Sequence, residues 1–186
     1  MKDLKKYNVE IIFQDFMKAD LKEAVEKLKD YKDICVVTNL PYYITSKIIT
    51  KIVSSNTPIN RLVAMVQKEV AEKLCSDEKS PLKMMINYVG DIQYEMNVPR
   101  QVFMPAPHVD SAVISIHKER VISEELIQLI EASYKAKRKT LYNNLKPLYK
   151  DSTKEILEAS GIAPNKRAEE LEIEDYIRIL ERSHTL

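Results

Sequence analysis

Residues 39–42 read Asn-Leu-Pro-Tyr, a combination that could hold and activate an amine attached to an aromatic ring, such as the exocyclic amine of adenine. Such an amine is a poor nucleophile because its lone pair is delocalised into the ring. The Asn39 amide oxygen and a main-chain carbonyl, that of Leu40 or Pro41, could accept its two N–H bonds and favour a pyramidal nitrogen whose lone pair faces an electrophile. Stacking on Tyr42, worth about 1–3 kcal/mol, could hold the base outside its helix. Taken alone, the four residues are equally well explained as a turn from a strand into a helix.

A strand before this turn must position it. Residues 34–38, Ile-Cys-Val-Val-Thr, have the pattern of a strand buried on both faces of a parallel sheet that helices cover. Ligands of open α/β sheets bind at the carboxyl ends of the strands, which is where Asn39 stands. Pro41 fixes its own φ and keeps Leu40 out of the helical region, so the chain turns stiffly. Thr45 is then the expected N-cap of a helix that carries Ile48, Ile49, Ile52 and Val53.

The alternation of strand and helix recurs through the first part of the chain. The predicted elements are a strand over 9–13, a helix over 19–28, the strand over 34–38 and its helix, a strand over 61–66, a helix over 68–75, a helix over 82–89, and strands over 93–98 and 112–117. Three units of a strand followed by a helix indicate an α/β layer fold. The last two strands are expected to close the sheet in antiparallel fashion.

The pattern is helical throughout beyond Arg120, which predicts a domain over residues 1–120 and a small all-helical domain over 121–186. Helices are expected over 124–145, over 153–159 with Gly161 ending it, and over 173–181. Basic residues without an intervening acid form a block that could bind phosphates, namely Lys135, Lys137, Arg138, Lys139, Lys146 and Lys150. The alternative is a solvated helix face that the acidic residues of 169–175 neutralise.

Composition excludes several classes of protein. The chain has 186 residues, 45% of them hydrophobic, and a formal net charge of only +1, so a nucleic-acid role must rest on local patches. Gly90 and Gly161 are its only glycines, which excludes glycine-rich nucleotide loops. Cys35, Cys75 and the three histidines have no metal-ligand spacing, so no metal is expected. With no run of 18 apolar residues and no secretory signal, we expect a monomeric cytoplasmic protein that does not enter a membrane.

Five segments together resemble the ribosomal RNA adenine dimethyltransferases of the KsgA type, which methylate two adjacent adenines of small-subunit (16S) ribosomal RNA. They are residues 14–17, 37–44, 65–71, 103–113 and 137–141, in the order in which that family has them. The second segment, Val-Thr-Asn-Leu-Pro-Tyr-Tyr-Ile, and the fourth, which begins Phe-Met-Pro-Ala-Pro-His-Val-Asp-Ser, are long and specific. The resemblance implies a partial Rossmann-like sheet of the S-adenosylmethionine-dependent methyltransferases, followed by the helical domain, and a role in ribosome biogenesis.

The resemblance also implies roles for single residues. Asp15 would bind the adenine end of S-adenosylmethionine with Phe16 against its ring, and Asn39 would be catalytic and lie near the methionine end. Leu40, Pro41 and Tyr42 would present the target adenine, and Phe103 would pack on it from the other side. The ribosomal RNA of the small-subunit particle would contact Lys68 and the helical domain. The basic residues proposed for that contact are Lys135, Lys137, Arg138, Lys139 and Lys146.

The family's glycine-rich first strand and turn do not occur in this sequence, which lacks roughly two β-α units of about 30 residues each. Truncation is the favoured explanation, ahead of a split enzyme that another chain completes and a remnant that only binds RNA. We therefore expect the chain alone to bind S-adenosylmethionine weakly or not at all. A related alternative is the family that methylates large-subunit RNA and confers macrolide resistance. Residues 105–111 and the long helical tail favour the small-subunit type.

Overall fold

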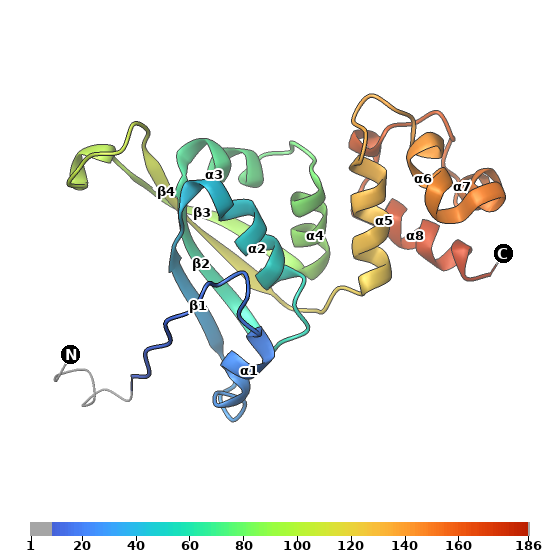
Figure 1. Cartoon of the computed structure of the whole chain (residues 1–186). Coiled ribbons are helices and arrows are strands. Elements are labelled where there is room, and N and C mark those ends of the chain that lie inside the picture. Colours follow the sequence, from blue (N-terminus) through green and yellow to red (C-terminus); the bar gives the residue numbers. More distant parts are fainter. Residues whose placement is uncertain (1–8, 186) are drawn as a thin grey trace.

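The computed structural model describes residues 9–185 and contains one mixed sheet packed against helices (Figure 1). Its strands are β1 (Ile34–Asn39), β2 (Ile59–Gln67), β3 (Gly90–Val98) and β4 (Ser111–Lys118). They lie in the order β1-β2-β4-β3. β1 pairs with β2 in parallel, whereas β4 is antiparallel to both of its neighbours, which confirms the expected antiparallel closing strands.

Three helices pack against one face of this sheet, namely α2 (Thr45–Val53), α3 (Lys68–Cys75) and α4 (Pro81–Val89) (Figure 1). Ser80 caps α4 by accepting the N–H of Lys83 at 3.2 Å, and Pro81 stands in the first turn, where its missing N–H costs nothing. Full burial of an aliphatic side chain contributes about 1.5–3 kcal/mol. The predicted apolar residues of α2 are at most 3% exposed, and they are Ile48, Ile49, Ile52 and Val53.

The segment before the first helix does not join the sheet. Residues 9–13 form no strand and pair with none of the four strands described, so the predicted strand there was wrong. A β-branched run becomes a strand only where a neighbour completes its ladder, and Phe13 is instead 92% exposed. The predicted helix over 19–28 is shorter, α1 (Leu21–Glu26), with Asp20 as its N-cap. Two units of a strand followed by a helix, rather than three, are therefore present in the described chain.

β1 is an edge strand with one covered face and one open face. Exposure alternates along it, from Ile34 at 4% to Val37 at 75%. The expectation of a strand buried on both faces was wrong, because α2, α3 and α4 all pack against one face of the sheet and the opposite face of β1, which carries Val37, is left exposed. Side chains alternate along a strand, so Asn39 shares the exposed side with Cys35 and Val37.

The chain after β4 is helical, as predicted, but its first helix is broken. The helices are α5 (Glu124–Tyr134), α6 (Leu141–Tyr149), α7 (Thr153–Ala159) and α8 (Ile173–Ser183). A single helix over 124–145 was expected, whereas Thr140 starts α6 as its N-cap. The amide of buried Asn144 donates to the carbonyls of Ser133 at 2.6 Å and Ala136 at 3.1 Å, which stabilises the break. Gly161, at φ +73°, follows α7 as predicted.

The helical part has a core of its own around two tyrosines. The hydroxyls of Tyr134 on α5 and Tyr176 on α8 both donate to the carbonyl of Ala168 at 3.2 Å. Burial raises the pKa of Tyr134 to about 12. These bonds hold the segment before α8 against α5.

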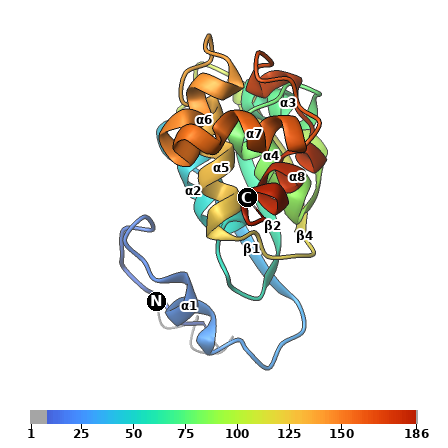
Figure 2. The same ribbon diagram turned by 90° about the vertical axis from the view of Figure 1, so that its right-hand side faces the viewer.

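The helical part meets the sheet part through α4, which packs against α5 and α8 (Figure 2). Lys79, in the loop before α4, also forms an ion pair with Glu172. The boundary expected near residue 120 lies in the connection between β4 and α5. The division into two domains stays a prediction.

Candidate functional site

Hydrogen bonds hold the turn after β1 in place. Leu40, only 7% exposed, donates its N–H to the carbonyl of Met65 at 3.4 Å, which continues the pairing of β1 with β2 beyond Asn39. Pro41, with φ of −62° and ψ of 129°, then leads into a short 3-10 helix (Tyr42–Ile44). The two strands therefore fix where Asn39 and Leu40 stand, and Pro41 fixes the direction in which the chain leaves.

The carbonyl of Pro41 accepts two hydrogen bonds, one from the N–H of Ile44 at 3.2 Å and one from the hydroxyl of Thr45 at 3.1 Å. The prediction of Thr45 as N-cap was wrong, since Thr45 is the first residue of α2 and Ile44 holds the cap position. The Thr45 hydroxyl donates back to a carbonyl four residues earlier, so it does not serve an N–H of the helix. Both lone pairs of the Pro41 oxygen are engaged.

Tyr42 is fixed at its far end. Its hydroxyl forms a 2.8 Å hydrogen bond with the hydroxyl of Ser111, the buried first residue of β4. The neighbouring Tyr43 is 85% exposed, although the two residues are adjacent. The bond to β4 therefore sets the orientation of the Tyr42 ring and leaves that of Tyr43 free.

The loop between β3 and β4 carries Phe103 and is fastened at its base. The side chain of Asp110 accepts the N–H of Arg100 at 3.0 Å, and its carbonyl accepts the N–H of Lys68 at 3.0 Å. The N–H of Phe103 donates to the carbonyl of Arg100 at 3.2 Å, which closes a short 3-10 helix (Arg100–Val102). The loop is thereby tied to the junction of β2 and α3.

The turn and the loop together line an open hollow of about 240 Å³, here named the corner pocket. This volume is slightly below the roughly 300–1,000 Å³ of pockets that bind drug-sized ligands. The corner pocket thus brings together all five residues that the sequence predicted for catalysis, and three further residues line it. Its lining consists of Asn39, Leu40, Pro41, Tyr42, Met65, Phe103, Pro105 and Pro107.

Met65 is a lining residue that the sequence analysis did not single out. It is the Cα partner of Asn39 in the parallel pairing of β1 with β2. The signal was available, because the ends of adjacent parallel strands meet at one edge of a sheet and Met65 lies at the end of a predicted strand.

Asp15 and Phe16 lie outside the corner pocket. The Asp15 carboxylate accepts the N–H of Met17 at 2.9 Å in a local turn. Phe16 lines a different hollow, of about 320 Å³, beside α1. The ammonium of Lys51, on α2, lies 5.6 Å from the centre of the Phe16 ring and donates to the carbonyls of Phe16, Met17 and Ala19 at 2.9, 2.9 and 2.6 Å. The predicted roles of Asp15 and Phe16 in binding the methyl donor stay predictions.

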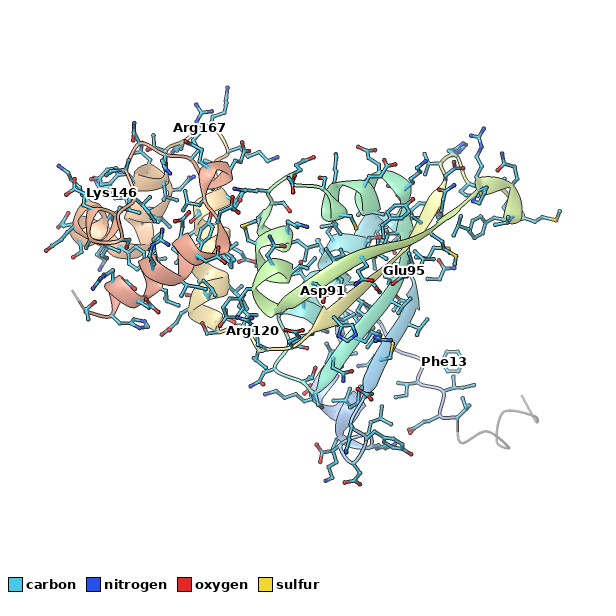
Figure 3. All side chains as sticks on the ribbon, turned by 180° about the vertical axis from the view of Figure 1, so that it is seen from behind. Phe13, Asp91, Glu95, Arg120, Lys146 and Arg167 are labelled. Carbon is cyan, nitrogen blue, oxygen red and sulfur yellow. The ribbon has the colours of Figure 1, made fainter. Side chains whose placement is uncertain are left out.

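The predicted basic residues form two separate groups. Lys68 lies near the corner pocket at the start of α3, with its ammonium 3.8 Å from Glu72. The others lie in the helical part, where Figure 3 shows Lys146 far from Phe13. All of them are exposed, and they are Lys135, Lys137, Arg138, Lys139 and Lys146.

Lys166 and Arg167 join this second group, and the sequence analysis missed them. The N–H of Leu141 donates to the carbonyl of Lys166 at 2.6 Å, which places this segment at the start of α6. Within the described part of the chain, none of the predicted basic residues of 135–150 forms an ion pair with the acidic cluster, whose Glu172 and Asp175 pair with Lys79 and Arg178. The described residues thus show no direct ion pair between the cluster and the basic block, and both interpretations of the block stay predictions.

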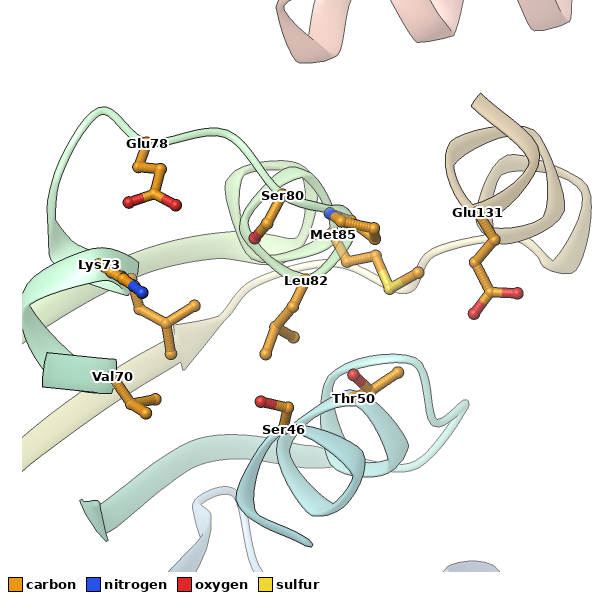
Figure 4. Close-up of a pocket in the computed structure, with 11 residues that line it drawn as sticks. Ser46, Thr50, Val70, Lys73, Glu78, Ser80, Leu82, Met85 and Glu131 are labelled. Carbon is orange, nitrogen blue, oxygen red and sulfur yellow. The ribbon is translucent and has the colours of Figure 1, made fainter. Parts of the chain in front are cut away.

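A larger apolar pocket lies elsewhere, between α2, α3, α4 and α5, with a volume of about 380 Å³ (Figure 4). Val70, Leu82 and Met85 line it, together with the hydroxyls of Ser46 and Thr50. It contains no residue that the sequence predicted for a site.

Within residues 9–185, no group of three or more histidine, cysteine, aspartate and glutamate side chains is arranged to hold a metal ion. None of the helices in that range combines the length and the apolar character needed to cross a membrane.

Known proteins resemble this chain in sequence. The family model for ribosomal RNA adenine dimethylase matches residues 1–184. The curated protein "Ribosomal RNA small subunit methyltransferase A" of Geobacillus kaustophilus is 40% identical over 186 residues, which cover 91% of this chain and 64% of that protein. The protein of the same name from Oceanobacillus iheyensis is 35% identical over an alignment of 188 positions, which covers 92% of this chain and 64% of that protein. The chain thus spans somewhat less than two thirds of the length of these relatives.

Solved structures show the same fold. A dimethyladenosine transferase from Plasmodium falciparum superposes with a TM-score of 0.69 at 24% identity, over 81% of this chain and 66% of that one. The 23S rRNA methyltransferase ErmE gives a TM-score of 0.62 at 21% identity, over 98% and 75%. The predicted fold class, a partial Rossmann-like sheet followed by a helical part, is confirmed. Because the family model spans nearly the whole sequence, the chain belongs to the ribosomal RNA adenine dimethylase family.

Proposed function

We propose that this chain captures an unstacked adenine of small-subunit ribosomal RNA in the corner pocket and presents its exocyclic amine for methylation by S-adenosylmethionine. The observation that carries the proposal is the meeting of Asn39, Tyr42 and Phe103 in one open hollow, from segments far apart in the sequence. The relatives named as small-subunit methyltransferases favour the small-subunit substrate over the large-subunit one.

Two acceptors would bind the amine. The Asn39 side chain is exposed at the end of β1 and supplies an amide oxygen. Of the two carbonyls considered, that of Pro41 already accepts bonds from Ile44 and Thr45, so the acceptor is the carbonyl of Leu40. With both N–H bonds directed at these oxygens, the nitrogen becomes pyramidal and its lone pair points at the methyl group. As the N–C bond forms, the bond between the sulfonium sulfur and the methyl carbon breaks, and the methylated amine then loses its acidic proton to water, so no strong general base is required.

Two aromatic rings would hold the base. Tyr42 is oriented through its bond to Ser111, and Phe103 lines the same pocket from the loop after β3, which Pro105 and Pro107 stiffen. Stacking between rings is worth about 1–3 kcal/mol per base and offsets the few kcal/mol spent in taking the base out of its helix.

The methyl donor supplies an electrophilic methyl group on a sulfonium. Asp15 and Phe16 are proposed to hold its adenine end, with Asn39 near its methionine end. These residues do not line a common pocket: Phe16 lies against α1 and the Asp15 carboxylate is used in a local turn. Binding of the methyl donor by this chain is therefore expected to be weak. The residues of the corner pocket fit the adenine of RNA better than Asp15 and Phe16 fit the donor.

The helical part, residues 121–186, is proposed as a domain that binds the ribosomal RNA of the small-subunit particle, next to a methyltransferase domain over 1–120. Its exposed basic residues between α5 and α6, with Lys166 and Arg167 beside them, would contact phosphates. Such contacts position the RNA without choosing the adenine, because phosphates carry no sequence information. We further propose that the protein acts as a monomer in the cytoplasm and takes part in ribosome biogenesis.

The test is transfer of labelled methyl groups to small-subunit RNA at the highest soluble donor concentration. Asn39→Ala should lower the rate about a hundredfold or more, as the loss of a preorganised polar group in an active site does, while RNA affinity stays unchanged. Asn97→Ala, at an exposed asparagine near the end of β3, is the matched control. A wild-type rate in the Asn39→Ala variant would refute the proposed role.

A further inference from the structure

A polar groove of about 560 Å³ adjoins the corner pocket, here named the Arg100 groove. Residues close in sequence line the two hollows on two segments. Pro107 lines the corner pocket and His108 the groove, while on β2 Met65 lines the pocket and Gln67 the groove. When a base enters the corner pocket, the RNA strand on either side of that base must run past the rim of the pocket. The side chains of the adjoining groove could therefore contact the flanking nucleotides.

The three carboxylates of the groove already have partners. Glu69 pairs with Lys73 at 3.0 Å, and Glu72 lies 3.8 Å from Lys68. The Asp110 side chain accepts the main-chain N–H of Arg100 at 3.0 Å. Within the described residues, the guanidinium of Arg100 is in contrast paired with no carboxylate. Two cations line the groove: Lys68 lies 3.8 Å from Glu72, so Arg100 is the one of the two without a carboxylate partner among the described residues.

The Arg100 side chain is also held in position. One terminal nitrogen of its guanidinium donates to the carbonyl of His108 at 3.1 Å, across the base of the Phe103 loop. Since a guanidinium has five N–H donors in a planar fork, one such bond leaves donors for both oxygens of a phosphate. The anchored side chain loses less rotamer freedom on binding than a free lysine would.

We propose that Arg100 binds a backbone phosphate of a nucleotide that flanks the adenine held in the corner pocket. The inference rests on the proposed function and adds to it a contact for the substrate strand. Arg100 and the basic block of the helical part would then hold the RNA at two separate places. Contacts at these two places would fix the position of the RNA strand along the protein, so that the target adenine reaches Asn39.

The experiment measures binding of a small-subunit rRNA hairpin that carries 2-aminopurine directly beside its two adjacent adenines, which keep the exocyclic amines that the corner pocket is proposed to bind. Fluorescence anisotropy gives the affinity at several salt concentrations, and the 2-aminopurine intensity reports unstacking at saturation. Arg100→Ala should weaken binding about threefold to tenfold and reduce the salt slope by about 1, as the loss of one phosphate contact does. The intensity change at saturation should persist, because the rings of the corner pocket are intact.

Two variants keep the result interpretable. Arg120→Ala removes an exposed arginine beyond the opposite end of β4, and it should bind like the wild type. Arg100→Lys keeps the charge and should restore the salt slope even if the bond to His108 is lost. The inference is wrong if Arg100→Ala matches Arg120→Ala in affinity and salt slope. It is also wrong if Arg100→Ala loses the intensity change because the loop collapses and Arg100→Lys does not recover the salt slope. If the wild type binds without any intensity change, the proposed function itself fails instead.

Discussion

The corner pocket and the segment of residues 9–20 were both expected to belong to one site, yet they differ in how the chain supports them. The pocket is built from the ends of two paired strands and a fastened loop, and its aromatic Tyr42 is bonded to β4. The segment makes no strand, and its Phe13 and Ile12 are 92% and 62% exposed. The residues proposed to hold the target adenine therefore line one pocket, whereas Asp15 and Phe16, proposed to hold the methyl donor, lie outside it.

The difference shows that a sequence motif predicts a site only where neighbouring elements of the fold hold its side chains in position. Residues 9–13 have a strand composition as good as that of β1, but β1 has a ladder to β2 and they have none. Lys51 ties the end of the segment to α2: its ammonium donates to three carbonyls and lies 5.6 Å from the centre of the Phe16 ring.

The largest contrast should lie in stability. Ile49→Ala, at a side chain that is 0% exposed on α2, should lower the free energy of unfolding by about 2–5 kcal/mol. Ile12→Ala, in the exposed segment, should change it by less than about 0.5 kcal/mol. Urea denaturation followed by circular dichroism measures both. A comparable loss in the two variants would mean that the segment packs in solution and would remove the contrast.

A smaller effect is expected where the segment is anchored. Lys51→Met keeps the length of the side chain but removes the three hydrogen bonds to the carbonyls of Phe16, Met17 and Ala19. Stability should fall by about 1–3 kcal/mol, and proteases should cut near residue 18 sooner. Lys47→Met, at an exposed lysine of the same helix, is the control and should leave both readouts unchanged.

The smallest signal should come from the methyl donor itself. Calorimetric titration of the chain with S-adenosylmethionine should show no saturation in the micromolar range, because Asp15 and Phe16 do not share a pocket with Asn39. Sinefungin, a donor analogue without a transferable methyl, should behave in the same way. A micromolar dissociation constant for either compound would show that this chain forms a binding site for the methyl donor, and the difference between the corner pocket and the segment of residues 9–20 would not hold.

The sequence predicted most of the elements and brought five residues of the corner pocket together, and its main errors arise where a contact with another part of the chain decides the structure. β2, β4 and the helices from α2 to α4 follow from apolar periodicity and caps, and Asn39, Tyr42 and Phe103 follow from motifs that stand at strand ends and loops. The strand at 9–13 was wrong because it depends on a neighbouring strand, and the double burial of β1 was wrong because it depends on helices over both faces of the sheet; a local pattern contains neither. The break after Tyr134 was missed because Asn144, a residue ten positions away, stabilises it through carbonyls.

The most direct test of the account is whether the two rings of the corner pocket hold the unstacked base. The saturated complex with the 2-aminopurine hairpin should lose its fluorescence change in Tyr42→Ala and in Phe103→Ala, with binding weaker by about 1–3 kcal/mol. Tyr43→Ala, next to Tyr42 in sequence but 85% exposed, should keep the change and the affinity of the wild type. If all three variants behave alike, the corner pocket does not receive the base and the account is contradicted.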